Sequence, residues 1–73
     1  MARRDVKSEI TARVWKIEAQ PGARLAADDP IMILESMKME IPVSAPMAGT
    51  VAEIRVAEHD MVQEGQVVAV MET

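Results

Sequence analysis

Residues 31–36, with the sequence Ile-Met-Ile-Leu-Glu-Ser, match residues 68–73, Val-Ala-Val-Met-Glu-Thr, at an offset of 37 positions. The same offset aligns two further stretches without a gap, namely residues 14–17 with 51–54 and Leu25 with Val62. The second copy of the opening stretch is rich in β-branched side chains, which favour strands over helix interiors. If the two copies fold alike, residues 31–35 form a strand as well.

The start of this stretch also fits the beginning of a helix. The segment 28–30, Asp-Asp-Pro, offers capping carboxylates and a proline suited to the first helical position, and good helix formers follow it. Apolar residues at helical spacing are Ile33, Leu34, Met37 and Ile41. Taken alone, the segment slightly favours a helix, and the strand-like second copy reverses that preference.

Turn-forming residues divide the chain into short apolar stretches. The turn signals are Pro21-Gly22, Asp28-Asp29-Pro30, Ser44-Ala45-Pro46 and Glu64-Gly65. The strands predicted between them cover residues 10–17, 25–27, 31–35, 39–43, 50–56, 61–62 and 67–71. Such a series of short strands predicts an all-β barrel or sandwich. Residues 1–9 have little apolar content and are predicted to be a flexible tail, which leaves residues 10–73 as one domain.

The repeat also predicts where the central lysine lies. Residues 37–38 connect the first copy to the second, and the equivalent position in the second copy falls just after Thr73. A two-fold relation between the copies would place these two positions at opposite ends of the barrel. We therefore expect Lys38 in a tight hairpin at one end and both termini at the other.

The composition narrows the class of protein. The 73 residues include 12 acidic and 8 basic side chains, and the resulting net charge of −4 disfavours binding to nucleic acid. Trp15 is the only aromatic residue, so no platform for stacking bases is available. No apolar run is long enough to cross a membrane, and no signal-peptide core follows the basic start. We expect a cytoplasmic protein without nucleic-acid or membrane partners.

The sequence offers little for catalysis. His59 is the only histidine, cysteine and tyrosine are absent, and the serines have no evident base beside them. There is no glycine-rich phosphate loop and no cluster of residues spaced as metal ligands. We therefore predict neither catalytic residues nor a metal site, and expect a protein that carries or binds.

Residues 35–40, Glu-Ser-Met-Lys-Met-Glu, place one lysine between two methionines with an acid on each side. Together with the apolar residues 33–34, this segment closely resembles the attachment site of biotinyl domains, the biotin carboxyl carriers of biotin-dependent carboxylases. Residues 45–51, Ala-Pro-Met-Ala-Gly-Thr-Val, are similar to the second half of that family. The resemblance spans roughly residues 10–72. It implies a flattened barrel of two four-stranded antiparallel sheets with pseudo-two-fold symmetry, which agrees with the repeat.

The resemblance also implies a function. Lys38 stands where the family's lysine carries biotin through an amide bond. Met37 and Met39 would then be flanking recognition residues, with Glu35 and Glu40 as weaker candidates. The implied role is that of a free-standing, non-catalytic carrier in an acyl-CoA type carboxylase, such as the acetyl-CoA carboxylase of fatty acid biosynthesis. The implied partners are biotin protein ligase, a biotin carboxylase subunit and a carboxyltransferase subunit.

Two other functions remain open. A lipoyl carrier shares the barrel and the position of the lysine, although lipoyl domains usually place an acid before the lysine and a small residue after it. An unmodified barrel that serves only as a scaffold is the third possibility. Without the motif, Met37 and Met39 would be interpreted as core residues. The side chains assigned to packing are Trp15, Met32, Met47, Met61 and Met71, while His59 is assigned to a turn, where histidine tolerates positive φ.

Overall fold

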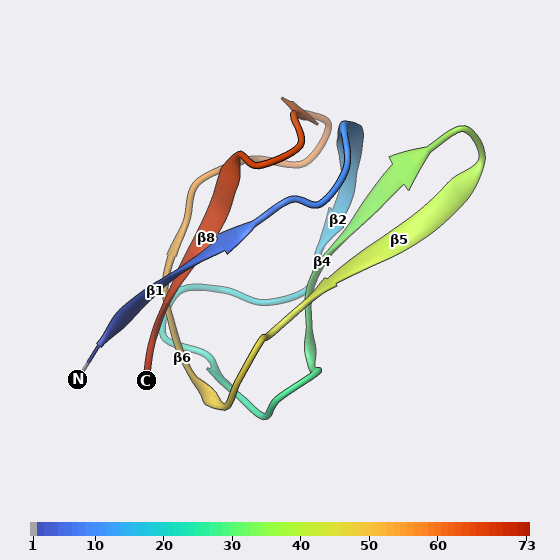
Figure 1. Cartoon of the computed structure of the whole chain (residues 1–73). Coiled ribbons are helices and arrows are strands. Elements are labelled where there is room, and N and C mark those ends of the chain that lie inside the picture. Colours follow the sequence, from blue (N-terminus) through green and yellow to red (C-terminus); the bar gives the residue numbers. More distant parts are fainter. Residues whose placement is uncertain (1) are drawn as a thin grey trace.

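The computed structural model describes residues 2–73. In this range all regular secondary structure is β-strand (Figure 1). The strands are β1 (Arg3–Lys7), β2 (Ala12–Ile17), β3 (Arg24–Leu25), β4 (Pro30–Ser36), β5 (Met39–Ser44), β6 (Gly49–Ile54), β7 (Met61–Val62) and β8 (Val67–Glu72). The strand expected at residues 31–35 is confirmed, and the helix alternative is wrong. The reason is long-range pairing, because β4 is hydrogen-bonded on one side to β2 and on the other to β5, and such tertiary pairing overrides a weak helix propensity.

The strands form two four-stranded antiparallel sheets, ordered β1-β8-β6-β3 and β5-β4-β2-β7. Exchanging β1–β4 with β5–β8 converts one order into the other, which is the signature of a pseudo-two-fold axis. The sequence offset of 37 relates the strands directly, since β2 begins at Ala12 and β6 at Gly49, while β3 begins at Arg24 and β7 at Met61. The predicted flattened barrel with pseudo-two-fold symmetry is confirmed.

Turns repeat with the same offset, down to single backbone hydrogen bonds. The N–H of Gly22 donates to the carbonyl of Val51 at 2.7 Å. In the second half, the N–H of His59 donates to the carbonyl of Val14 at 2.7 Å. Both donors have positive φ, 93° at Gly22 and 79° at His59. The assignment of His59 to a turn with positive φ is confirmed.

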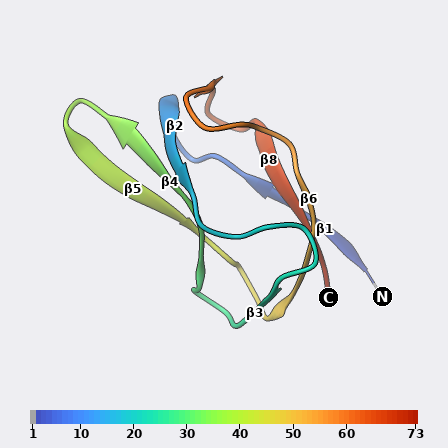
Figure 2. The same cartoon turned by 180° about the vertical axis from the view of Figure 1, so that it is seen from behind.

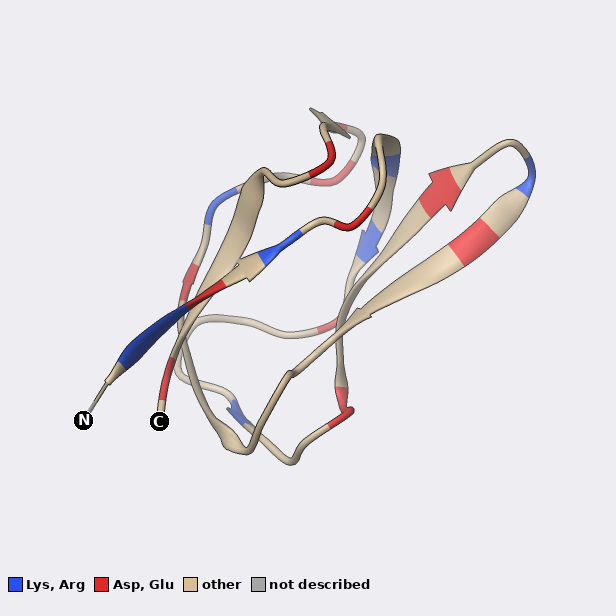
Figure 3. Ribbon diagram, viewed as in Figure 1, with Lys and Arg blue, Asp and Glu red and all other residues tan. Residues whose placement is uncertain are grey.

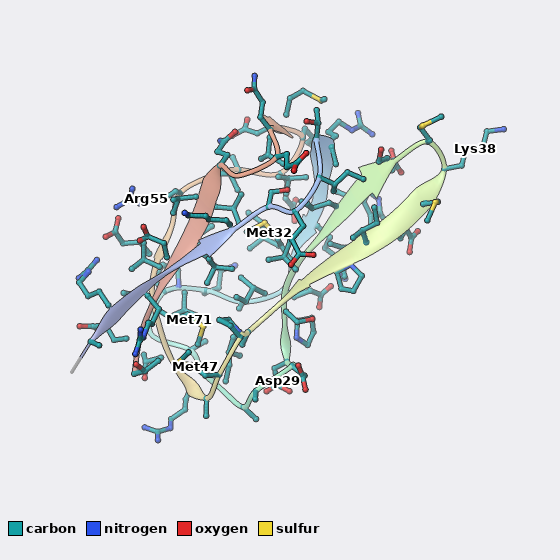
Figure 4. All side chains as sticks on the ribbon, in the orientation of Figure 1. Asp29, Met32, Lys38, Met47, Arg55 and Met71 are labelled. Atoms are coloured by element: carbon teal, nitrogen blue, oxygen red, sulfur yellow. The ribbon has the colours of Figure 1, made fainter. Side chains whose placement is uncertain are left out.

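The core lies between the sheets and is built mainly by β4 and β8, each of which has a neighbour on both sides. Ile31, Met32 and Leu34 of β4 are fully buried. On β8, Met71 is fully buried as well, and the sulfur atoms of Met32 and Met71 point into the barrel (Figure 4). These two methionines are packing residues, as predicted, and Met47 is partly buried.

The predicted N-terminal tail is wrong over residues 3–7, because these residues form β1. The strand pairs with β8 from Arg3 opposite Glu72 to Lys7 opposite Val67. Its charged side chains point outward, whereas Val6 is only 5% exposed and joins the core. Backbone pairing and one buried valine are enough to hold a strand whose other residues are polar. Met1, the first residue of the predicted tail, lies outside the described residues.

Two side chains assigned to packing lie on the surface instead. Trp15 is 41% exposed and Met61 is 65% exposed. Trp15 sits at an irregularity in β2, where the register against β4 shifts between Val14 and Lys16. A bulge of this kind adds a residue to one strand and re-aims its side chain, so Trp15 turns away from the core.

The molecule is elongated, with extents of 36 × 18 × 17 Å. The β4–β5 hairpin protrudes at one end, and the two chain ends lie together at the other (Figures 1 and 2). Among residues 2–73, no helix is long and apolar enough to cross a membrane. The lysine hairpin therefore projects beyond most of the barrel.

Candidate lysine-presenting hairpin

The hairpin that carries the lysine closes with a two-residue turn. Ser36 of β4 pairs with Met39 of β5, so Met37 and Lys38 are its central residues. Both have positive φ, 49° at Met37 and 68° at Lys38. Positive φ at both positions defines the type I′ geometry, whose twist matches that of paired strands and which is normally occupied by Asn, Asp or Gly. Two side chains with a Cβ in this conformation mark a strained turn.

The tip of the hairpin is almost fully open to solvent. Met37 is 92% exposed and Met39 63% exposed, so their interpretation as core residues is excluded. The Lys38 side chain extends away from the barrel at the outermost point of the molecule (Figure 4). Within residues 2–73 its amine forms no ion pair with a carboxylate. The amine is therefore free to enter another protein's active site, with a flexible apolar side chain on each flank.

Two carboxylates lie directly behind the tip. Glu35 and Glu40 are paired across β4 and β5, and the acidic segments behind a basic tip are visible in Figure 3. Like charges in this arrangement repel each other. Arg13 of β2 offsets part of that repulsion, because its guanidinium donates to Glu35 Oε1 at 3.2 Å. Arg13 was not among the residues predicted for the site, although its position between the buried Ala12 and Val14 in a strand marks it as an outward-facing residue.

At the opposite end of the barrel, β1 and β8 are paired as β5 and β4 are at the lysine end. Ala2 and Thr73 exchange two backbone hydrogen bonds, of 3.0 and 2.9 Å. At the offset of 37 these two residues correspond to Met39 and Ser36. Lys38 in a tight hairpin, with both termini at the far end, is therefore confirmed.

A separate hollow of about 520 Å³ lies between the edge strands β1 and β5. Its apolar lining includes Val6, Ile10, Leu34, Ile41 and Val43, and it includes none of residues 35–40. Within the described part of the chain, no three His, Cys, Asp or Glu side chains are grouped as they would be around a metal ion. The lysine is presented on a projection and not within this hollow.

Solved structures show the same fold. Over 99% of this chain, a urea carboxylase of Kluyveromyces lactis superposes with a TM-score of 0.92 and 38% identity, and the match spans 6% of that protein. A single-chain, multi-domain long-chain acyl-CoA carboxylase matches 94% of the chain with a TM-score of 0.89 and 25% identity, over 7% of its own length. An all-β barrel of this topology, with a lysine on its protruding hairpin, is a carrier domain.

Sequence comparisons give the family. Residues 5–71 match the biotin/lipoyl family model, described as biotin-requiring enzyme. A biotinylated protein TB7.3 homolog of Mycobacterium leprae is 42% identical over 92% of this chain and 94% of its own. The biotin/lipoyl attachment protein of Bacillus subtilis is 39% identical over 85% of each chain. The chain belongs to the biotin/lipoyl family and is a biotinyl domain, with biotin as its cofactor.

The hairpin suits this cofactor. A primary amine that projects from the surface and lacks a carboxylate partner can form an amide with the carboxyl group of biotin. Among the residues predicted for the site, the structure brings Lys38, Met37 and Met39 together at the tip. Glu35 and Glu40 form the next pair along the hairpin, behind Ser36 and Met39. Their part in recognition stays a prediction.

Proposed function

We propose that Lys38 is the biotinylated residue and that the domain carries a carboxyl group from a biotin carboxylase to a carboxyltransferase. The observation that carries this proposal is the isolated amine of Lys38 at the apex of a strained hairpin, in a chain of a biotin-requiring family. Lys7 and Lys16, by contrast, lie within β1 and β2. Only Lys38 projects beyond the barrel.

Attachment would join Nζ of Lys38 to the carboxyl carbon of biotin. The lysine nitrogen would lose a proton as it forms the new carbon–nitrogen bond, and a leaving group supplied by ATP would depart from the carboxyl carbon with the electron pair of the broken bond. Biotin then supplies a ureido nitrogen that can take up and release a carboxyl group. The lysine side chain and the biotin chain together span about 14 Å from standard bond lengths. Added to the protruding hairpin, this arm would reach neighbouring active sites while the barrel remains outside them.

A carboxylase of the acyl-CoA type is part of the proposal, and one of the solved structures similar to this chain supports it. The structural relatives include a long-chain acyl-CoA carboxylase and a urea carboxylase, and human pyruvate carboxylase is a relative by sequence. The chain spans 94% of the Mycobacterium leprae relative but only 6% of the pyruvate carboxylase. The proposal includes a separate carrier subunit that docks on its carboxylase and carboxyltransferase, and a cytoplasmic localisation.

Intact mass spectrometry tests the attachment directly. Chain purified from biotin-replete cells that contain a biotin protein ligase should gain the mass of one biotinyl group, and fragmentation should map it to Lys38. The isolated carboxylase and carboxyltransferase subunits should transfer carboxyl only when the loaded chain is added. A chain that carries no biotin, or carries it on Lys7 or Lys16, would contradict the proposal.

Lipoylation is the second candidate, because the family includes lipoyl carriers and the Bacillus subtilis relative is a biotin/lipoyl attachment protein. The same mass measurement separates the two, since biotinyl and lipoyl groups differ in mass. The methionines on both sides of Lys38 favour biotin.

A further inference from the structure

The pseudo-two-fold axis gives each outward residue of one sheet a counterpart on the other. The outer faces of the two sheets therefore correspond position by position, and a difference between them is not required by the fold. Trp15 corresponds to Ala52, and Met61 corresponds to Arg24, at the common offset of 37. The β5-β4-β2-β7 face thus carries large apolar side chains where the β1-β8-β6-β3 face carries an alanine and an arginine.

The central residues of the two faces differ in the same way. Val70 lies between Asp5 and Glu53 and is 2% exposed. Glu53 there is paired with two guanidinium groups, those of Arg3 and Arg55. The outer face of the β1-β8-β6-β3 sheet thus has a buried central residue beside a cluster of ion-paired side chains.

The corresponding residue of the other sheet is Ile33. It lies between Lys16 and Pro42 and remains partly exposed. No pair of ions crosses it among residues 2–73, because the amine of Lys16 pairs with Glu18 of its own segment, at 3.5 Å. Exposed apolar surface thus remains on one sheet and is covered on the other.

The local cause of the Trp15 exposure is the bulge in β2. Both Trp15 and Lys16 are exposed, although neighbouring residues of a regular strand point to opposite faces. The second half has an equivalent bulge between Val51 and Glu53, where the extra residue is Ala52. The bulge therefore belongs to the fold, whereas the indole that it presents belongs to this face alone.

The apolar surface is continuous with the lysine hairpin. Met61 pairs with Arg13, and Arg13 in turn pairs with Glu35, so these residues form one outward row across β7, β2 and β4. Along β4 the outward residues Ile33 and Glu35 lead to Met37, the first residue of the turn. Four residues of strand place Ile33 about 13 Å from Met37. A standard interface of about 800 Å² on each partner is roughly 30 Å across, so one docked protein would cover both.

We propose that the outer face of the β5-β4-β2-β7 sheet, defined by Trp15, Ile33 and Met61, is the docking surface for the ligase that acylates Lys38. The Trp15 ring would enter an apolar recess of that ligase, and Arg13 and Glu35 would satisfy each other within the contact. This inference rests on the proposed function, because it requires Lys38 to be the acylated residue.

The choice of the ligase over the carboxylase follows from what each must recognise. Before acylation, only protein surface distinguishes Lys38 from Lys7 and Lys16, so the ligase has to bind the domain itself. After acylation, the biotin is a ligand that an active site can bind directly. An aromatic anchor near the lysine is therefore most useful to the enzyme that acts first. Tryptophan is among the residues that most often dominate binding at protein interfaces.

The test is the steady-state kinetics of biotinylation of the full chain in its unmodified form. A purified biotin protein ligase, biotin and ATP are held constant while the concentration of the chain is varied. The double variant Trp15→Ala with Met61→Arg gives this face the residues that the other sheet carries at equivalent positions. We expect KM for the chain to rise about tenfold or more with kcat nearly unchanged. Arg24→Ala, at the position equivalent to Met61, should leave both constants unchanged.

Circular dichroism and the melting temperature establish that each variant is folded. A Trp15→Phe variant, which keeps an aromatic ring, should have a KM close to that of the wild type. A folded double variant with the KM of the wild type would overturn the inference, as would an equal rise in Arg24→Ala. A wild-type dimer that the double variant converts to monomer, with KM unchanged, would assign the face to a second copy. A defect confined to carboxyl transfer would assign it to the carboxylase and equally overturn the inference. If the wild-type chain itself accepts no biotin, the proposed function fails first.

Discussion

Replacing Met37 with asparagine should stabilise the domain. Met37 has a φ of 49°, and the left-handed conformation costs a residue with a Cβ about 1–2 kcal/mol. Asparagine adopts this conformation more readily, since its short polar side chain can bond to the nearby backbone. Met37 is 92% exposed, so its removal sacrifices almost no packing. The expected net gain in the free energy of unfolding is about 0.5–1 kcal/mol.

For a domain of this size, 1 kcal/mol corresponds to about 4–8 °C in melting temperature, so Met37→Asn should melt about 2–8 °C higher than the wild type. Thermal unfolding followed by circular dichroism measures the change, with urea unfolding as a second measure. Met39→Asn is the matched control, because Met39 is also exposed but lies in β5 without positive φ. Asparagine is disfavoured in strands, so the control should melt at the wild-type temperature or lower. An unchanged or lower melting temperature for Met37→Asn would refute the assignment of strain to this turn.

Three further changes test the site and the fold. Lys38→Arg should keep the melting temperature, because an exposed cation replaces an exposed cation, yet avidin blotting should detect no biotin, since a guanidinium is not acylated. Combining Met37→Asp with Met39→Ala should lower biotinylation and raise lipoylation where both ligases are present, as read by mass spectrometry, and unchanged biotinylation would remove the methionines from recognition. Gly49→Ala would bring a Cβ to 2.5 Å from the carbonyl oxygen of Glu72, so urea unfolding should show a loss of about 1–3 kcal/mol; wild-type stability would contradict this contact.

The repeat predicted most of the fold because each copy carries the same buried positions. It also contained the strand that was missed. Extended backward by 37 residues, the pattern aligns Val6 with Val43 and Ser8 with Ala45, and all four residues are buried. Charged side chains obscured this relation in β1, since only one of its five residues is buried. A flexible tail and an edge strand can have similar composition. Residues 3–7 form a strand because their backbone pairs with β8.

The surface residues were harder to predict, because their direction depends on register. Trp15 lies between the buried Val14 and the exposed Lys16. The single bulge at this position determines which face of the sheet the Trp15 side chain lies on. The sequence of β2 contains no turn residue that would mark this bulge. Met61 was missed for a related reason, since the two-residue strand β7 is too short to show an alternating pattern.

The identity of the cofactor also lay beyond physical reasoning on the residues. The offset of 37 predicted that Lys38 occupies one end of the barrel, and the composition led to the expectation of a protein that carries or binds. Neither shows which acyl group the amine accepts. That step came from the resemblance of residues 33–40 to biotinyl domains, which the family comparison confirmed. The positive φ of Met37 and Lys38 could not be predicted either, because neither residue type favours a type I′ turn.

This conflict between residue type and conformation bears on the function of the turn. At the other end of the barrel, the pairing of β1 with β8 continues to Ala2 and Thr73, which exchange two backbone hydrogen bonds. At the lysine end, the turn between Ser36 and Met39 joins the two copies. Asparagine or glycine would do so with less strain than methionine and lysine. Two strained and exposed side chains at this point contribute little to the fold, and this is the reason for proposing that their value lies in contacts with other proteins.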